Sequence, residues 1–245
     1  MFELYQDNYF LPYYYTASPY YNISNQMQNN TPVTNDEIKW QLSLYSLIYD
    51  WDNLSIASSF TIKAFWQVNT SRPWFRSADY NPELFIAYKF SNEIKTTLGI
   101  SHESNGKGDQ FERSWNRLFA NFKYTDDHFL FEFMPWIIPI KNNEAVEYQN
   151  DKIEDYLGRE KITIGYKINY FETKLSIQNI EDLTRIQYTF SESIQFSNHY
   201  AIYFQYFYGY GQSLLEYNHF TQAYGIGIQF MEDKSNTTCN CNKNI

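Results

Sequence analysis

The feature that most constrains the fold is an alternation of apolar and polar side chains with a period of two. Between Leu54 and Trp66 the even positions are mostly apolar, whereas the odd positions are mostly polar and include Lys63. Residues 161–168 divide in the same way. Successive side chains of a strand point to opposite faces, so this period predicts β-strands with one apolar face and one polar face. We therefore expect an all-β chain.

A soluble β-sandwich would show the same alternation, so other features must separate it from a membrane barrel. Aromatic residues make up 20% of the chain. Many of them lie near the predicted strand ends, where a membrane barrel carries its interfacial girdle. The longest uncharged apolar run, residues 133–140, is far shorter than the ~20 residues of a spanning helix. Helical membrane proteins are thereby excluded.

The predicted connections alternate in length, which also favours an outer-membrane barrel. The short connections lie at residues 50–53, 91–92, 125–126 and 169–170, and the long ones at residues 68–82, 105–114 and 138–158. Short turns on one side and long loops on the other are typical of barrels that cross the outer membrane.

The same pattern predicts the number of strands. Eleven strands are expected at residues 37–49, 54–66, 83–90, 93–104, 115–124, 127–137, 161–168, 171–179, 184–191, 199–209 and 222–230. Bacterial single-chain barrels have an even number, and the aromatic segment Asn8–Thr16 supplies the missing one. We predict one domain, a twelve-stranded antiparallel transmembrane β-barrel within residues 1–230, followed by a polar C-terminal tail at residues 231–245.

Charge and cysteine content narrow the choice of partners. The net charge of −9 argues against a nucleic-acid partner, which would require a basic patch. Acidic loops remain compatible with calcium. Cys239 and Cys241 lie in the polar tail and cannot cross-link the body of the barrel. The first residues show no signal peptide, so either the chain is not exported or its export signal has been removed.

Three polar residues interrupt the apolar faces of two neighbouring predicted strands. His102 and Ser104 continue the register of Ile100, and Asn116 shares the register of Leu118. Polar groups that face lipid cost free energy unless they are hydrogen-bonded, so such residues usually have a function. A serine nucleophile, a histidine base and an asparagine that orients the histidine would explain the placement. From the pattern alone, the favoured explanation is that they are only interfacial polar residues at strand ends, where such residues are common.

The remaining histidines offer no comparable arrangement. His128 follows a turn, His199 starts a strand and His219 lies in a loop, each without a serine and an acid on the same register. We expect no catalytic role for them.

Segments across most of the chain carry a family resemblance. They are residues 102–106, 113–117, 36–44, 75–85 and 208–214, with a spacing of 14 residues between His102 and Asn116. Together they closely resemble the outer-membrane phospholipase A family.

The resemblance implies a twelve-stranded barrel in the bacterial outer membrane that hydrolyses acyl esters of phospholipids and lysophospholipids. It implies a dormant monomer and an active, calcium-dependent homodimer. Within this family pattern, Ser104 is the nucleophile, His102 the base and Asn116 the orienting residue, and the amide of Gly106 contributes to the oxyanion hole.

The resemblance also implies a set of calcium ligands. They are the main-chain carbonyl of Lys107 and the side chain of Glu112 from one subunit, and the carbonyl of Arg72 from the partner subunit. Glu112 departs from the family pattern, which has a hydroxyl there, but a carboxylate is a good ligand for a hard cation. The loop that carries Arg72 is also short for the family. Asp109 is a further acidic candidate.

The alternative interpretation is a passive outer-membrane channel or adhesin without catalysis. In that case the residues that matter would be the charged ones expected to face the lumen: Lys63, Arg117, Lys123, Lys161, Lys174 and Glu132. Twelve strands leave little open pore once long side chains fill the lumen.

Overall fold

The computed structural model describes residues 2–20, 33–108, 111–139 and 152–232. The strands are β1 (Phe2–Leu4), β2 (Asn8–Thr16), β3 (Asp36–Trp51), β4 (Leu54–Gln67), β5 (Trp74–Lys89), β6 (Ile94–Ser104), β7 (Ser114–Thr125), β8 (Phe129–Ile137), β9 (Glu160–Ile168), β10 (Phe171–Gln178), β11 (Gln187–Gln195), β12 (Tyr200–Tyr210) and β13 (Phe220–Phe230). Two short helices, α2 (Ile153–Leu157) and η4 (Leu214–Glu216), lie in long connections. No helix among the described residues is long and apolar enough to cross a membrane.

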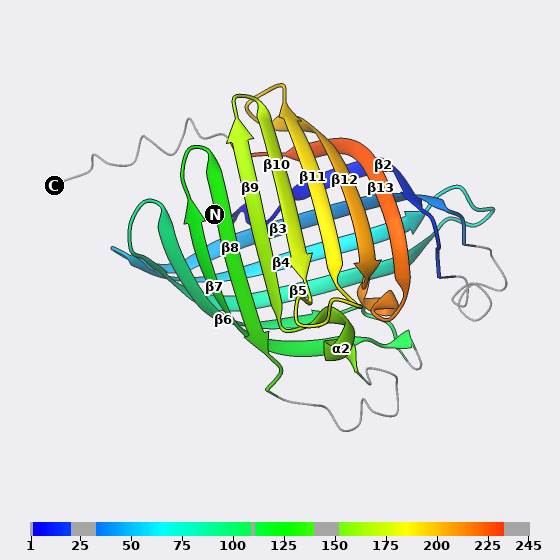
Figure 1. The fold of residues 1–245 in the computed structure, drawn as a ribbon, viewed down its shortest axis with the longest axis horizontal. Helices are drawn as coiled ribbons and strands as arrows, with labels where there is room; N and C mark the ends of the chain where they lie inside the picture. Colours follow the sequence, from blue (N-terminus) through cyan, green and yellow to red (C-terminus); the bar gives the residue numbers. More distant parts are fainter. Residues whose placement is uncertain (1, 21–32, 109–110, 140–151, 233–245) are drawn as a thin grey trace.

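The strands form one antiparallel sheet that closes on itself (Figure 1). β2 pairs with β13 on one side and with β3 on the other, and β3 also pairs with β4. β1 and β2 pair with different halves of β3, so together they occupy one position in the barrel. The result is the predicted barrel of twelve antiparallel strands.

The two faces of the barrel differ as the alternation predicts. On β6, Leu98 and Ile100 are 60% and 57% exposed on the outer surface. Large apolar side chains line the outer face of the other strands in the same way. The interior holds buried polar and charged residues, including Arg76 and Asp79. An apolar band outside and a polar interior are the arrangement of a barrel surrounded by lipid.

The prediction of a long loop at residues 68–82 was wrong, because β5 already begins at Trp74. The segment from Arg76 to Asn81 is rich in polar residues and resembles a loop in composition. In the barrel, Arg76 and Asp79 point into the polar interior and are buried there, whereas Phe75 is 44% exposed outside. A polar lumen lets a strand carry charges that a soluble core would exclude.

The long connections gather at one end of the barrel, as predicted. Residues 68–73, 105–113, 138–159, 179–186 and 211–219 join strands at this end, and α2 lies among them in Figure 1. The turns at the opposite end are short, with Asp52 and Asn169 at positive φ.

The connection that carries η4 is bonded to residues of the barrel interior. The main-chain N–H of Leu214 donates to Asp79 at 2.9 Å, and Glu216 forms a buried ion pair with Arg76. Leu214 and Leu215 are only 2% exposed. This connection is therefore packed into the barrel end rather than extended into solvent.

Several of the charged residues that we expected in the lumen are paired across strands. Lys63 lies 3.4 Å from Asp79, Arg117 lies 3.0 Å from Glu103, and Lys174 lies 2.9 Å from Asp7. Glu132 accepts a hydrogen bond from Asn121 at 2.6 Å, and Lys123 stands opposite Glu132 in the register. Lys161 is half-buried on β9. The first two ion pairs link neighbouring strands, and the pair of Lys174 with Asp7 joins β10 to the segment between β1 and β2.

Candidate active site

His102 and Asn116 stand directly opposite each other on β6 and β7. Both side chains are exposed on the outer face. Their neighbours on that face, Ile100 and Leu118, are exposed apolar residues. Because side chains alternate along both strands, this register puts the imidazole and the amide side by side on the apolar surface.

The pair is joined by a hydrogen bond of 2.9 Å between Nδ1 of His102 and Oδ1 of Asn116. When the amide oxygen accepts, Nδ1 carries the proton, and Nε2 is left with a free lone pair. Asn116 therefore selects the tautomer that a general base requires. Because the amide is neutral, it does so without placing a carboxylate charge on the apolar surface.

Ser104 lies two residues beyond His102 on the same face of β6, where it is half-buried. Its register partners are Ser114 on β7 and Tyr80 on β5. Among the described residues, no hydrogen bond links the Ser104 hydroxyl to the His102 ring. Catalytic hydrogen bonds are often long in a free enzyme and shorten when substrate binds.

Gly106 is the second residue of the connection after β6 and adopts φ of +60°. An added Cβ at this position would lie 3.0 Å from the ring of Tyr80. Both the left-handed backbone and the adjacent ring favour glycine here. The connection therefore turns sharply within two residues of Ser104.

Two residues that the sequence pattern did not single out lie against this site. Tyr80 is the cross-strand neighbour of Ser104 and packs on Gly106. Asn105 is 3% exposed, and its side chain bonds to the main chain of the connection between β6 and β7. The even register of β5 could have indicated Tyr80, and the Asn105–Gly106 dipeptide is a turn signal.

The residues expected to hold calcium lie in connections at the same end of the barrel. Arg72 is exposed, and its carbonyl accepts a hydrogen bond from the Thr70 hydroxyl at 2.9 Å. Lys107 and Glu112 belong to the connection that follows Ser104, and Glu112 is exposed. Asp109 lies outside the described residues, as do Cys239 and Cys241 and the tail from residue 233 onward.

A carboxylate and main-chain carbonyls form an all-oxygen donor set, which suits a hard cation such as calcium. Within residues 2–20, 33–108, 111–139 and 152–232, no three or more His, Cys, Asp or Glu side chains cluster in a metal-binding arrangement. The chemistry of the expected donors, two main-chain carbonyls and one carboxylate, therefore suits calcium.

The other histidines lie apart from this site. His128 bonds through Nδ1 to the Lys167 carbonyl at 3.1 Å, and Nε2 of His219 bonds to the Ser18 carbonyl at 2.7 Å. His199 precedes β12 and its ring contacts Tyr200.

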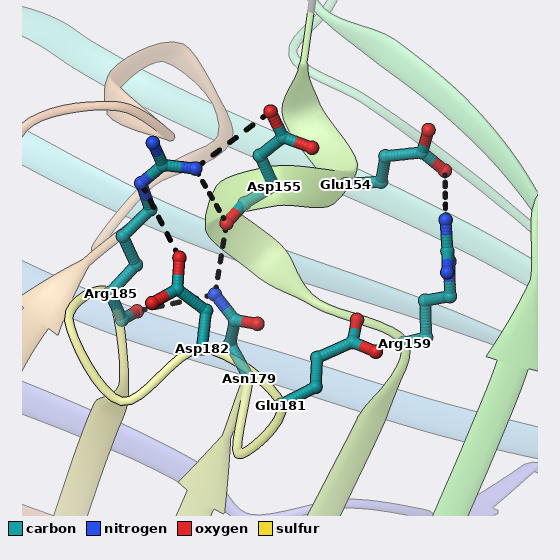
Figure 2. Close-up of a pocket in the computed structure, with 7 residues that line it drawn as sticks. All are labelled: Glu154, Asp155, Arg159, Asn179, Glu181, Asp182 and Arg185. Atoms are coloured by element: carbon teal, nitrogen blue, oxygen red, sulfur yellow. Dashed lines mark hydrogen bonds and ion pairs between the residues drawn. The ribbon is translucent and has the colours of Figure 1, made fainter.

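A charged pocket also lies away from the candidate triad, between α2 and the connection after β10 (Figure 2). Its two arginines are already paired. Arg159 lies 3.3 Å from Glu154, and Arg185 lies within 3.8 Å of Asp155 and 3.7 Å of Asp182. The pocket contains none of the residues predicted for catalysis.

Comparison with known proteins identifies the family. The family model for phospholipase A1 matches residues 1–230. Phospholipase A1 of Klebsiella pneumoniae is 30% identical over 213 residues, which cover 79% of this chain and 70% of that protein.

Solved structures agree with this match. The calcium-bound dimer of the Salmonella typhi outer membrane phospholipase superposes with a TM-score of 0.86 at 26% identity, covering 95% of this chain and 93% of that one. An Escherichia coli outer membrane phospholipase A, described as an active-site mutant with an asparagine changed to alanine, gives 0.83 at 27% identity and covers 94% and 91%. The chain therefore belongs to the phospholipase A1 family, and it is a phospholipase of the bacterial outer membrane.

Proposed function

We propose that this protein hydrolyses the acyl esters of phospholipids and lysophospholipids with a Ser104–His102–Asn116 triad on its lipid-facing surface. The observation that carries the proposal is the 2.9 Å hydrogen bond between His102 and Asn116, beside Ser104 on the apolar face. The E. coli relative described as an active-site mutant, in which an asparagine is replaced, supports the role of Asn116.

The triad would act by general-base and then general-acid catalysis. Nε2 of His102 takes the hydroxyl proton while Oγ of Ser104 attacks the ester carbonyl. The proton then passes from Nε2 to the departing lysolipid oxygen, which leaves an acyl group on Ser104. Water, deprotonated in turn by His102, attacks the acyl carbonyl. The bond to Oγ of Ser104 then breaks, Nε2 of His102 returns the proton to Oγ, and the fatty acid is released. Asn116 holds the ring in one orientation through both halves of the reaction.

The oxyanion would be stabilised by the connection that follows Ser104. The main-chain N–H of Gly106 is the donor that the family resemblance assigns, and the positive φ of Gly106 fixes the local backbone. Removing one such donor in other hydrolases costs roughly 10²–10³ in turnover.

The face on which the triad lies determines how substrate arrives. Leu84, Ile100 and Leu118 surround it with exposed apolar surface. A phospholipid can therefore reach Ser104 laterally from the membrane and keep its acyl chains against the strands. The substrate does not need to pass through the polar interior. In this respect the proposed function differs from that of a channel.

We also propose that calcium and a second copy of the chain complete the site. The Salmonella typhi relative is described as a dimer with bound calcium. The Lys107 carbonyl and Glu112 would bind the cation together with the Arg72 carbonyl of the second copy. When bound, calcium supplies positive charge near the oxyanion.

Release of fatty acid from phospholipid micelles by the purified protein tests the proposal. We expect release that requires calcium, stops on addition of a chelator and is absent from Ser104→Ala. Release by Ser104→Ala at the rate of the parent protein would contradict the triad. Release that persists in full with chelator present would contradict the calcium requirement and leave the triad intact.

A further inference from the structure

Asn105 ties together both ends of the connection between β6 and β7. Its Nδ2 donates to the Phe111 carbonyl at 2.8 Å. Its Oδ1 accepts from the main-chain N–H of Lys107 at 3.2 Å and of Arg113 at 3.1 Å. Its own main-chain N–H donates to the Arg113 carbonyl at 3.0 Å. The side chain is 3% exposed, so these bonds are shielded from water.

The residues that Asn105 bonds lie next to Gly106, assigned to the oxyanion, and Glu112, assigned to calcium, and include Lys107, also assigned to calcium. The bond from Oδ1 to Lys107 spans Gly106 and closes a turn around it, consistent with its φ of +60°. Phe111, whose carbonyl accepts from Nδ2, and Arg113, whose main-chain N–H donates to the same Oδ1 as Lys107, flank Glu112. One buried side chain therefore sets the main chain next to Gly106, Lys107 and Glu112.

We propose that Asn105 is the positioning residue of this site: it orients the Gly106 amide toward the oxyanion and holds the Lys107 carbonyl and Glu112 in the geometry that binds calcium. The inference rests on the proposed function. Asn105 touches neither substrate nor metal in this role and acts through the main chain that it bonds.

The chemistry of the contacts requires an amide. The side chain donates one hydrogen bond and accepts two at the same time, which serine is too short to do and aspartate cannot do because it lacks a donor. In Asn105→Asp, the two acceptor bonds remain possible, but a carboxylate oxygen would face the Phe111 carbonyl.

Asn105 could instead serve only the stability of the barrel end, and Asn179 provides the matched control. Asn179 is 1% exposed and donates from Nδ2 to the carbonyls of Asp155 at 3.0 Å, Tyr156 at 3.1 Å and Arg185 at 3.4 Å. Figure 2 shows it joining α2 to the connection after β10. None of its partners is a residue of the candidate active site. Asn179 also adopts φ of +59°, which alanine disfavours, so Asn179→Ala reports the loss of a buried loop amide elsewhere together with some backbone strain.

The experiment compares Asn105→Ala, Asn105→Asp and Asn179→Ala with the parent protein in detergent. Heat-modifiable gel migration gives the folded fraction of each. Turnover and KM are measured on phospholipid micelles at saturating calcium, and calcium binding is measured directly by equilibrium dialysis. The calcium-binding measurement does not depend on hydrolysis.

We expect folded Asn105→Ala to lose at least about tenfold in kcat, because misplacing a catalytic donor by about 1 Å can cost up to 10²-fold. Half-saturation with calcium should need at least about fivefold more cation, because the ligand geometry is loosened. Asn105→Asp should fall between this variant and the parent, and Asn179→Ala should stay within about twofold of the parent in both measurements.

Equal losses in Asn105→Ala and Asn179→Ala, or an Asn105→Ala protein within about twofold of the parent in both kcat and calcium binding, would overturn the inference. If Asn105→Ala does not fold, the comparison is made with Asn105→Asp. A kcat and a calcium affinity equal to those of the parent protein in Asn105→Asp would then overturn the inference. A parent protein without Ser104-dependent hydrolysis would contradict the proposed function instead. Calcium binding by the same variants would then still test the role of Asn105.

Discussion

Glu37 binds the guanidinium of Arg76 with both carboxylate oxygens inside the barrel, at 2.7 Å from Nη2 and 3.0 Å from Nε. Both side chains are almost completely buried, and Nη1 of Arg76 pairs with Glu216 of η4. Arg76 also lies over the ring of Phe65, with 4.7 Å between its Cζ and the ring centroid. One arginine therefore joins β3 and β5 to the connection that packs into the barrel end.

Replacing Arg76 with methionine should destabilise the folded barrel by roughly 3–5 kcal/mol, because two buried carboxylates lose their cation. Gel migration after heating in detergent measures the loss as a lower unfolding temperature. Arg159→Met is the control, because Arg159 is 53% exposed and pairs with Glu154 at the surface. Arg159→Met should lower the free energy of unfolding by no more than about 1 kcal/mol. Equal stability of the two variants would contradict the structural role of Arg76.

Ser104→Ala and His102→Ala should each lower turnover by a factor of roughly 10⁴ or more, because nucleophile and base act as a unit. Asn116→Ala should keep roughly 50 times the activity of either variant or more, because an orienting residue is partly dispensable. Rates of fatty-acid release give the comparison. His128→Ala, in a turn at the far end of the barrel, should match the parent. An Asn116→Ala protein as inactive as Ser104→Ala would assign Asn116 a larger role than orientation.

Gly106→Ala should reduce kcat by at least about tenfold, because the new Cβ must be held at positive φ against the Tyr80 ring and the oxyanion donor shifts. Gly108→Ala is the control in the same connection, where an added Cβ meets nothing within 4 Å. Steady-state kinetics on micellar substrate measures kcat for both variants, and Gly108→Ala should match the parent protein. Matching kinetics for both variants would argue against an oxyanion role for Gly106.

Calcium should favour the dimer, because only two copies together offer Arg72 from one chain with Lys107 and Glu112 from the other. Chelation should shift the protein toward monomer and abolish turnover together. Sedimentation beside activity across a calcium titration measures both. Glu112→Ala should raise the calcium concentration needed for each effect, by roughly tenfold for a lost carboxylate contact worth about 1.4 kcal/mol.

The control for Glu112→Ala is Glu181→Ala, an exposed acidic residue in another long connection. It should leave both titrations unchanged. Dimerisation and turnover without calcium dependence, or a Glu112→Ala protein that titrates like the parent, would refute this ligand assignment.

The sequence was sufficient to predict the barrel because its signal is local. Alternation along β6 and β7 predicts which side chains face outward from the residues of each strand alone, and the register then brings His102 opposite Asn116. The start of β5 was missed because Arg76 and Asp79 resemble a loop until the polar lumen that buries them is known.

The contacts of Asn105 and of Arg76 could not be predicted from sequence for a different reason. Arg76 meets Glu216, which is far along the chain, and only closure of the barrel brings them together. Asn105 bonds main-chain atoms of the connection that follows it, and those bonds depend on the path of that connection. The Asn105–Gly106 dipeptide indicates a turn, but residue type and spacing do not indicate that Asn105 bonds Phe111 and Arg113 or that Arg76 pairs with Glu216.

The most direct test of the account is to identify the nucleophile with a long-chain alkylsulfonyl fluoride, which transfers its sulfonyl group to an activated serine and releases fluoride. Peptide mass spectrometry of the calcium-loaded protein should locate the sulfonyl group on Ser104, with loss of hydrolysis in proportion to labelling and no labelling of His102→Ala. Full loss of hydrolysis with the label on another residue, or labelling of Ser104 that leaves hydrolysis intact, would contradict the account.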